Sequence, residues 1–283
     1  MALDIMRCYT DAPPPRDPVL PGLMPGTVGS IVSPGGAGKS MLALLLSHLV
    51  GGGADLLNLG PHSTGLTAYL SAEDGADALH ERLHAIGARL SPEQREACAA
   101  GMLIEDLTPH APDLLDSRWL ESVEAIATSA RLLFLDTLRS FHSADENDGN
   151  KMAALIGALR SMAARTRCAI VFLHHSSKAL AVAGQGDMQQ ASRGSSVLTD
   201  NIRWQAFLAG MSKDEALVLS QNGTEPIGHD DRGFFVRFGI SKQNYGAPFN
   251  ERWFRRGQGG VLEPVELAQL AAGPRAARRR DGI

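Results

Sequence analysis

Cysteine is scarce in this chain of 283 residues, and the three that occur, Cys8, Cys98 and Cys168, lie far apart. Such spacing provides neither a disulfide framework nor a cysteine metal site, and it is typical of a reducing compartment. No apolar run is long enough to cross a bilayer, and the proline- and aspartate-rich start lacks the apolar core of a signal peptide. We therefore expect a cytoplasmic protein with no membrane partner.

An excess of positive charge is also absent. The 27 lysines and arginines are outnumbered by 31 aspartates and glutamates, which gives a formal net charge of −4. No global basic field attracts nucleic acid, so any contact with DNA or RNA must come from a local patch. With 44% hydrophobic residues, the chain can build one large α/β domain with small appendages.

Three regions are expected from the distribution of proline and charge. Residues 1–26 form an N-terminal extended arm, because the prolines at 13, 14, 15, 18 and 21 forbid helix there. This arm is either a disordered tail or a segment laid on a neighbouring subunit. Residues 27–264 form the main domain. Residues 265–283 form a basic C-terminal tail, which is either solvated or a weak nucleic-acid contact.

Apolar runs alternate with helical patterns along the main domain. This alternation predicts an α/β fold with a mostly parallel sheet, flanking helices and an antiparallel edge. The expected strands span residues 27–32, 66–70, 102–104, 132–135, 169–173, 202–208 and 234–241. The expected helices span residues 41–50, 76–88, 92–99, 117–127 and 151–165.

The sequence SPGGAGKS at residues 33–40 is the most informative feature of the chain. It lies between an expected strand and an expected helix, which is the order of a phosphate-binding P-loop. Glycines let consecutive N–H groups converge on phosphate oxygens, and the helix adds its positive dipole end. Lys39 is expected to reach the β- and γ-phosphates of ATP, and the Ser40 hydroxyl to ligate Mg²⁺. The predicted nucleotide-binding residues are Ser33, Gly35, Gly36, Ala37, Gly38, Lys39, Ser40 and Met41.

Two further strands are expected to end in acids. Asp136 follows a buried strand and is expected to support Mg²⁺ near the phosphates, although an acid there also caps turns. Glu73 follows another strand and is our candidate for the general base that activates water. Its neighbour Asp74 is more typical of an acid at a helix N-terminus.

A third strand ends in His174 and His175. Adjacent strand residues point to opposite faces, so the pair is a poor metal site. One imidazole at the strand end is instead expected to contact the terminal phosphate and to transmit its loss to the following loop. The residues alone do not decide which histidine does so, and a surface pair is the alternative.

Together, these motifs resemble the RepA-type replicative helicases of broad-host-range mobilisable plasmids, which are hexameric RecA/DnaB-like ATPases. The resemblance extends from about residue 12 to about residue 262, and Ser33 in place of the usual glycine belongs to it. The matching words are VSPGGAGKSM at 32–41, ED at 73–74, LDTLR at 135–139, VFLHH at 171–175, QQASRGSS at 189–196, DNIRWQ at 200–205, SK at 241–242, NYGAP at 244–248 and RWFRR at 252–256.

The resemblance implies an ATP-dependent DNA helicase, a homo-oligomeric ring of six subunits with ATP sites between neighbours. It implies that His175 is the phosphate sensor and that Arg203 reaches the adjacent subunit's site as an arginine finger. Judged from the residues alone, Arg203 could equally form an interfacial salt bridge. No primase module occurs in the sequence, so the primase and the replication initiator are expected on other chains.

The long polar segment at 178–193 is the expected contact for single-stranded DNA, with Lys178 and Arg193 as its only cations. Arg139, beside an acidic loop, is a weaker candidate. Two other functions remain open at this stage. One is a RecA-like recombination ATPase, and the other is a non-enzymatic, ATP-gated regulator.

Overall fold

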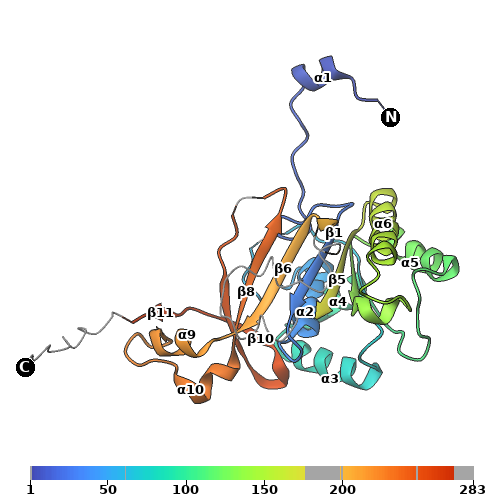
Figure 1. The fold of residues 1–283 in the computed structure, drawn as a ribbon. Helices are drawn as coiled ribbons and strands as arrows, with labels where there is room; N and C mark the ends of the chain where they lie inside the picture. Colours follow the sequence, from blue (N-terminus) through green and yellow to red (C-terminus); the bar gives the residue numbers. More distant parts are fainter. Residues whose placement is uncertain (1, 61, 176–197, 199, 247, 271–283) are drawn as a thin grey trace, which may run out of the picture.

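The computed structural model describes residues 2–60, 62–175, 198, 200–246 and 248–270. A nine-stranded sheet crosses this part of the chain in the order β10-β9-β8-β6-β1-β5-β4-β2-β3 (Figure 1). Six of these strands are parallel, and β8, β9 and β10 add an antiparallel edge. The strands are β1 (Val28–Ser33), β2 (Thr67–Ser71), β3 (Met102–Asp106), β4 (Leu132–Asp136), β5 (Ala169–His175), β6 (Trp204–Gly210), β8 (Phe235–Gln243), β9 (Arg252–Arg256) and β10 (Leu262–Val265).

Helices cover both faces of the sheet, as the alternating pattern predicts. One apolar cluster joins the sheet to α2 (Lys39–Gly52), α3 (Ala76–Gly87) and α4 (Pro92–Gly101). A second cluster joins the opposite face to α5 (Ser117–Ser129) and α6 (Gly149–Thr166). The mostly parallel α/β sandwich with an antiparallel edge is therefore confirmed. Among the described residues, no helix is both long and apolar enough to cross a membrane.

The central strand, β1, carries the glycine loop at its carboxyl end. It pairs with β5 on one side and with β6 on the other, both in parallel register. Ser33 lies opposite His175 in this register. Because parallel strands bring their carboxyl ends to one edge, the loop after β1 and the ends of β2, β4 and β5 meet there.

Helix α2 is held in place by close packing at its far end. A Cβ atom at Gly101, the last residue of α4, would overlap the Gly51 carbonyl oxygen, and one at Gly52 would overlap Cys98. The two helices therefore pack with their backbones in contact. Eleven of the 14 residues of α2 are buried, including all five of its leucines and its valine.

The N-terminal segment differs from the expected extended arm in two respects. Residues 5–10 form a short helix, α1 (Ile5–Thr10), because Asp4 caps it and the first proline comes only at Pro13. At the other end of the segment, Val19, Leu20 and Leu23 are fully buried in the core. The stretch that stands away from the body is therefore shorter than residues 1–26 (Figure 1).

The structure also adds a small unit that the sequence pattern did not predict. A two-stranded sheet pairs β7 (Leu219–Ser220) with β11 (Ala268–Gln269), beside α9 (Lys213–Val218) and α10 (Gly228–Asp231). Strand β6 begins later than expected, at Trp204. As a result Ile202 packs in the α5–α6 cluster and not on the face of Trp204.

Candidate active site

The glycine loop turns the chain from β1 into α2. Gly36 and Gly38 have φ angles of 72° and 102°, a region that residues with a Cβ atom rarely adopt. Gly38 is the N-cap residue of α2, so its conformation starts the helix. Ser33 is still in the strand, and its hydroxyl donates to the Pro34 carbonyl oxygen at 3.0 Å. The position that departs from the usual motif therefore needs no glycine-like backbone.

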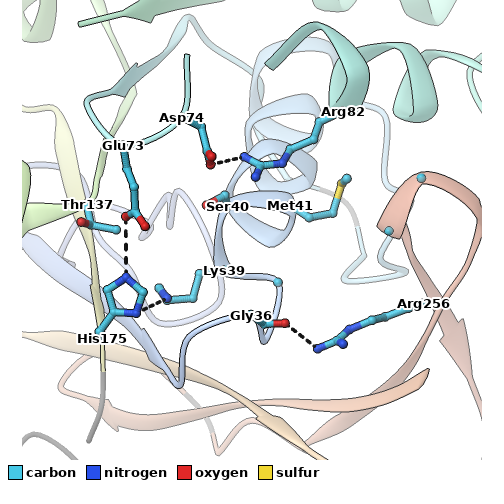
Figure 2. Close-up of a pocket in the computed structure, with 13 residues that line it drawn as sticks. Gly36, Lys39, Ser40, Met41, Glu73, Asp74, Arg82, Thr137, His175 and Arg256 are labelled. Atoms are coloured by element: carbon cyan, nitrogen blue, oxygen red, sulfur yellow. Dashed lines mark hydrogen bonds and ion pairs between the residues drawn. The ribbon is translucent and has the colours of Figure 1, made fainter. Parts of the chain in front are cut away.

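A cavity of about 340 Å³ lies beside this loop and receives side chains from four other segments (Figure 2). Such a volume is sufficient for a nucleotide's phosphates and ribose. Of the predicted site residues, the cavity brings together Gly36, Gly38, Lys39, Ser40, Met41, Glu73 and His175. It also contains Asp74, Arg82, Thr137, Arg256, Gly259 and Gly260.

Lys39, His175 and Glu73 form a continuous chain of polar contacts in this cavity (Figure 2). Lys39 is 5% exposed, and its Nζ lies 3.1 Å from Nδ1 of His175. The Nε2 atom of His175 lies 3.6 Å from Oε2 of Glu73. Because an ammonium group only donates, Nδ1 accepts, and in the neutral ring Nε2 carries the hydrogen that faces the carboxylate. Burial lowers the pKa of Lys39, while the charges of Asp136 and Glu73 act in the opposite direction.

Asp136 lies at the end of β4 and is fully buried. The Tyr69 hydroxyl donates a hydrogen bond to its Oδ2 atom, and Ser40 donates a second one to the same carboxyl group. Burial raises the pKa of Asp136, whereas these two hydrogen bonds lower it. Among the described residues, its Oδ1 atom has no hydrogen-bond partner. A buried, unpartnered carboxylate oxygen beside a serine hydroxyl is a donor set that fits Mg²⁺.

Only one of the two histidines lies in the cavity. His175 lines it, whereas His174, one residue earlier on β5, does not. This division follows from strand geometry, since neighbouring side chains point to opposite faces. Burial lowers the pKa of His174; the charge of Glu146 opposes this effect, and the charges of His175, Lys39 and His142 add to it.

Besides Thr137, Gly259 and Gly260, which line the cavity, two residues that hold Asp136 and the glycine loop were missed by sequence reasoning. Tyr69 lies within a fully buried strand, where its hydroxyl requires a hydrogen-bond partner. That requirement was the only signal in the sequence that could have pointed to the contact with Asp136. Arg256 lies at the end of β9, and its Nη2 atom donates to the loop carbonyls of Ala37 at 2.8 Å and Gly36 at 3.2 Å. No sequence pattern indicates that contact. Burial lowers the pKa of Arg256.

Another ion pair closes the site on the side of α3. Asp74 and Arg82 lie 2.6 Å apart, from Oδ2 to Nη1, and both are about three-quarters buried. Arg82 faces the cavity with its guanidinium group (Figure 2). This pair fixes the start of α3 directly after Glu73.

The remaining predicted residues lie elsewhere. Arg203 stands just before β6, and its N–H donates to the Val28 carbonyl oxygen at 3.1 Å, at the edge of the sheet opposite the glycine loop. There it lines a separate cavity of about 540 Å³ with Arg160 and Tyr245. Arg139 follows β4 and donates to the His142 carbonyl oxygen. Lys178 and Arg193 lie outside the described residues.

A glycine loop between the central strand and a buried helix, in a mostly parallel sheet, defines a P-loop ATPase with a RecA-like fold. A family model described as an AAA domain matches residues 2–181. Because that match covers more than half of the chain, the protein belongs to this AAA domain family. Among solved structures, the chain is similar to the RadB recombinase, with a TM-score of 0.53 and 14% identity over 86% of this chain and 92% of that one. At that identity the similarity concerns the fold.

Proposed function

We propose that the protein is an ATP-dependent DNA helicase, which hydrolyses ATP at the subunit interfaces of a ring and moves along single-stranded DNA in plasmid replication. The observation that carries the proposal is the Lys39–His175–Glu73 chain. It links the phosphate loop to the candidate general base and to the strand end that precedes the 178–193 segment. Three parts of the proposal, namely the helicase activity, the role in plasmid replication and the hexameric ring, rest on the resemblance to the RepA-type plasmid helicases.

In this proposal Lys39 and the loop N–H groups hold the phosphates of ATP. Glu73 orients the attacking water and accepts its proton. His175 contacts both Lys39 and Glu73, so loss of the terminal phosphate changes the contacts of this histidine at the end of β5. Mg²⁺, held by Ser40 and supported by Asp136, would neutralise charge on the β- and γ-phosphates. The carboxylate of Asp136 is held for this purpose by Tyr69.

Arg203 is proposed to act on the nucleotide of a neighbouring subunit. Its place at the sheet edge opposite its own glycine loop supports action between chains. The test is complementation between two inactive variants. Lys39→Ala removes the phosphate site, and Arg203→Ala removes the arginine finger. In a mixed ring, an intact site forms wherever the glycine loop of an Arg203→Ala subunit faces the Arg203 side chain of a Lys39→Ala neighbour. An equal mixture should restore about one site in four. No recovery from verified mixed rings would contradict the arrangement.

The helicase proposal is tested by ATPase and strand-displacement assays on the full chain. Single-stranded DNA should stimulate ATP hydrolysis, and a partly duplex substrate should be separated. Lys39→Ala should abolish both activities. Hydrolysis by the wild type without strand displacement would refute helicase function while leaving the ATPase intact. A replication initiator and a primase on other chains are the proposed partners.

A recombination ATPase is the second candidate, and the fold similarity to the RadB recombinase favours it. Imaging separates the two, since a recombinase forms open filaments on DNA and a ring helicase forms closed rings. A non-enzymatic, ATP-gated regulator is the third. Retained ATP binding with negligible turnover would support it, although Glu73 and His175 in the cavity argue for hydrolysis.

A further inference from the structure

The cavity beside Arg203 concentrates positive charge. It has a volume of about 540 Å³ and lies between α6 and the amino ends of β1 and β6. Its lining includes Arg160 of α6 as well as Arg203, and Arg167 lies beside Gly26 at its rim. Among the described residues, no aspartate or glutamate lines it. In a chain whose formal net charge is −4, such a cavity is a local site at which an anion would be stabilised.

The two arginines of this cavity keep their hydrogen-bond donors free. Within the part of the chain that the structure describes, the guanidinium groups of Arg160 and Arg203 make no hydrogen bond and no ion pair, and both residues are exposed. Arg165, on the same helix as Arg160, differs in that it pairs with Glu124 at 2.7 Å, from Nη2 to Oε2. Each guanidinium carries five N–H donors, so the cavity offers ten donors to a ligand that only accepts.

This cavity is too far from the glycine loop of its own chain to serve the nucleotide there. Gly26, Thr27 and Val28 line it at the amino end of β1, whereas the glycine loop follows the carboxyl end of the same strand. A strand of six residues spans about 20 Å. A phosphate that contacts Arg160 and Arg203 therefore comes from outside the nucleotide site of their own chain.

We propose that Arg160 is a second cation that acts with Arg203 on the phosphates of the nucleotide held by the neighbouring subunit. This role rests on the proposed function, since it requires ATP and an assembly in which the cavity of one chain faces the glycine loop of the next. Two planar guanidinium groups in one cavity suit the several oxygens of a triphosphate, because each can donate to two of them. Helix α6, which carries Arg160, contains none of the words that resemble the RepA-type helicases.

Mixtures of variants test whether Arg160 acts from the same face of the subunit as Arg203. A mixture of Arg160→Ala and Arg203→Ala chains contains no site with both arginines, so its ATPase activity should not exceed the average of the two variants. A mixture of Arg160→Ala and Lys39→Ala chains should exceed the average, because about one site in four is intact. Native mass spectrometry verifies that the chains have mixed. Recovery in the first mixture would place Arg160 on the side of the glycine loop, and that result, or no recovery in the second mixture, would overturn the proposal.

Steady-state kinetics measure the contribution of the side chain. Arg160→Ala should lower kcat for ATP by about tenfold or more, as expected for the loss of a charge-assisted contact with the reacting phosphates. Arg160→Lys should regain part of the activity, because it keeps the charge but not the paired donors. Arg118→Ala, an 89% exposed position on α5 outside the cavity, is the control and should match the wild type. An unchanged rate in Arg160→Ala would overturn the proposal. So would a loss confined to the DNA-stimulated rate, which would mean that the cavity binds DNA phosphates.

Binding measurements separate the neighbour's nucleotide from a free one. Equilibrium dialysis of the full chain with a non-hydrolysable ATP analogue should give one nucleotide per chain, both in the wild type and in Arg160→Ala/Arg203→Ala. Two nucleotides per wild-type chain and one in the double variant would mean that the cavity binds a nucleotide of its own, which would overturn the proposal. In sedimentation, the analogue should strengthen self-association of the wild type and not of the double variant. A wild type that hydrolyses ATP as a monomer would overturn this role and the ring together, whereas ATP hydrolysis without strand displacement would refute the helicase alone.

Discussion

The ammonium of Lys39 and the imidazole of His175 lie 3.1 Å apart, although 136 residues separate them in the chain. The contact arises because β1 and β5 are neighbours in parallel register, with Ser33 opposite His175. It places the loop lysine and the end of β5 in one polar chain that continues to Glu73. Any nucleotide phosphate bound by Lys39 will therefore meet the imidazole of His175.

His175→Asn should lower kcat for ATP by about 100-fold and change KM little, because the imidazole, which already lies beside Glu73, is proposed to act on the terminal phosphate during hydrolysis. His174→Asn is the matched control, since its side chain lies outside the cavity, and it should keep kcat within a few-fold of the wild type. Steady-state ATPase kinetics measure both. Equal losses in the two variants would show that the strand end, and not the imidazole in the cavity, is what matters.

Tyr69→Phe should shift the acid limb of the ATPase pH profile toward higher pH. Burial already raises the pKa of Asp136, and the Tyr69 hydroxyl opposes that effect by donating to the ionised carboxylate. Without this donor the pKa of Asp136 rises further, so a higher pH is needed to ionise it for Mg²⁺. The half-saturating Mg²⁺ concentration should also rise, because less of Asp136 is ionised at a given pH. Tyr9→Phe, in the exposed helix α1, serves as the control, and an unmoved acid limb in Tyr69→Phe would contradict this role.

Arg256→Ala should weaken ATP binding and lower the unfolding temperature. The guanidinium donates to two carbonyls of the glycine loop, and charge-assisted hydrogen bonds of this kind contribute about 1.5–3 kcal/mol. Arg255→Ala, at the exposed neighbouring position, removes the same charge without touching the loop. Fluorescent-nucleotide titration and calorimetry compare the pair. If both variants bind ATP equally well, the hydrogen bonds from Arg256 to the loop carbonyls do not hold the glycine loop in its nucleotide-binding conformation.

Ser33→Gly should leave ATPase activity nearly unchanged, because Ser33 has ordinary strand backbone. Gly38→Ala should weaken nucleotide binding by about fivefold or more, since φ at Gly38 is 102° and a Cβ atom is strained there by at least about 1 kcal/mol. Gly157→Ala, inside α6 with open space at its Cβ, controls for glycine replacement and should gain about 0.5–1 kcal/mol of stability. A large activity loss in Ser33→Gly would show that the serine has a role of its own.

The sequence predicted what is periodic and local. The order of strands and helices, the antiparallel edge and the glycine loop follow from runs such as residues 28–33 and from Gly36 and Gly38. What it did not predict depends on contacts between distant residues. Tyr69 and Asp136 are 67 positions apart, and Arg256 and Ala37 are 219 apart. Helix α1 was missed for another reason, because the prolines from Pro13 onward were assumed to keep all of residues 1–26 extended, although no proline precedes them and Asp4 caps a helix there.

The backbone contact between Gly51 and Gly101 extends the requirements of nucleotide binding to residues without reactive groups. Helix α2 has 14 residues and so places that contact about 20 Å from the phosphate loop. A methyl group at Gly101 would push the far end of α2 outward and rotate its first turn, where Lys39 and Ser40 lie. Gly101→Ala is thus a remote lesion of the catalytic centre. In a random mutagenesis screen for lost ATPase activity, we expect Gly101→Ala to be recovered together with variants of the glycine loop. The Gly101→Ala protein should still fold.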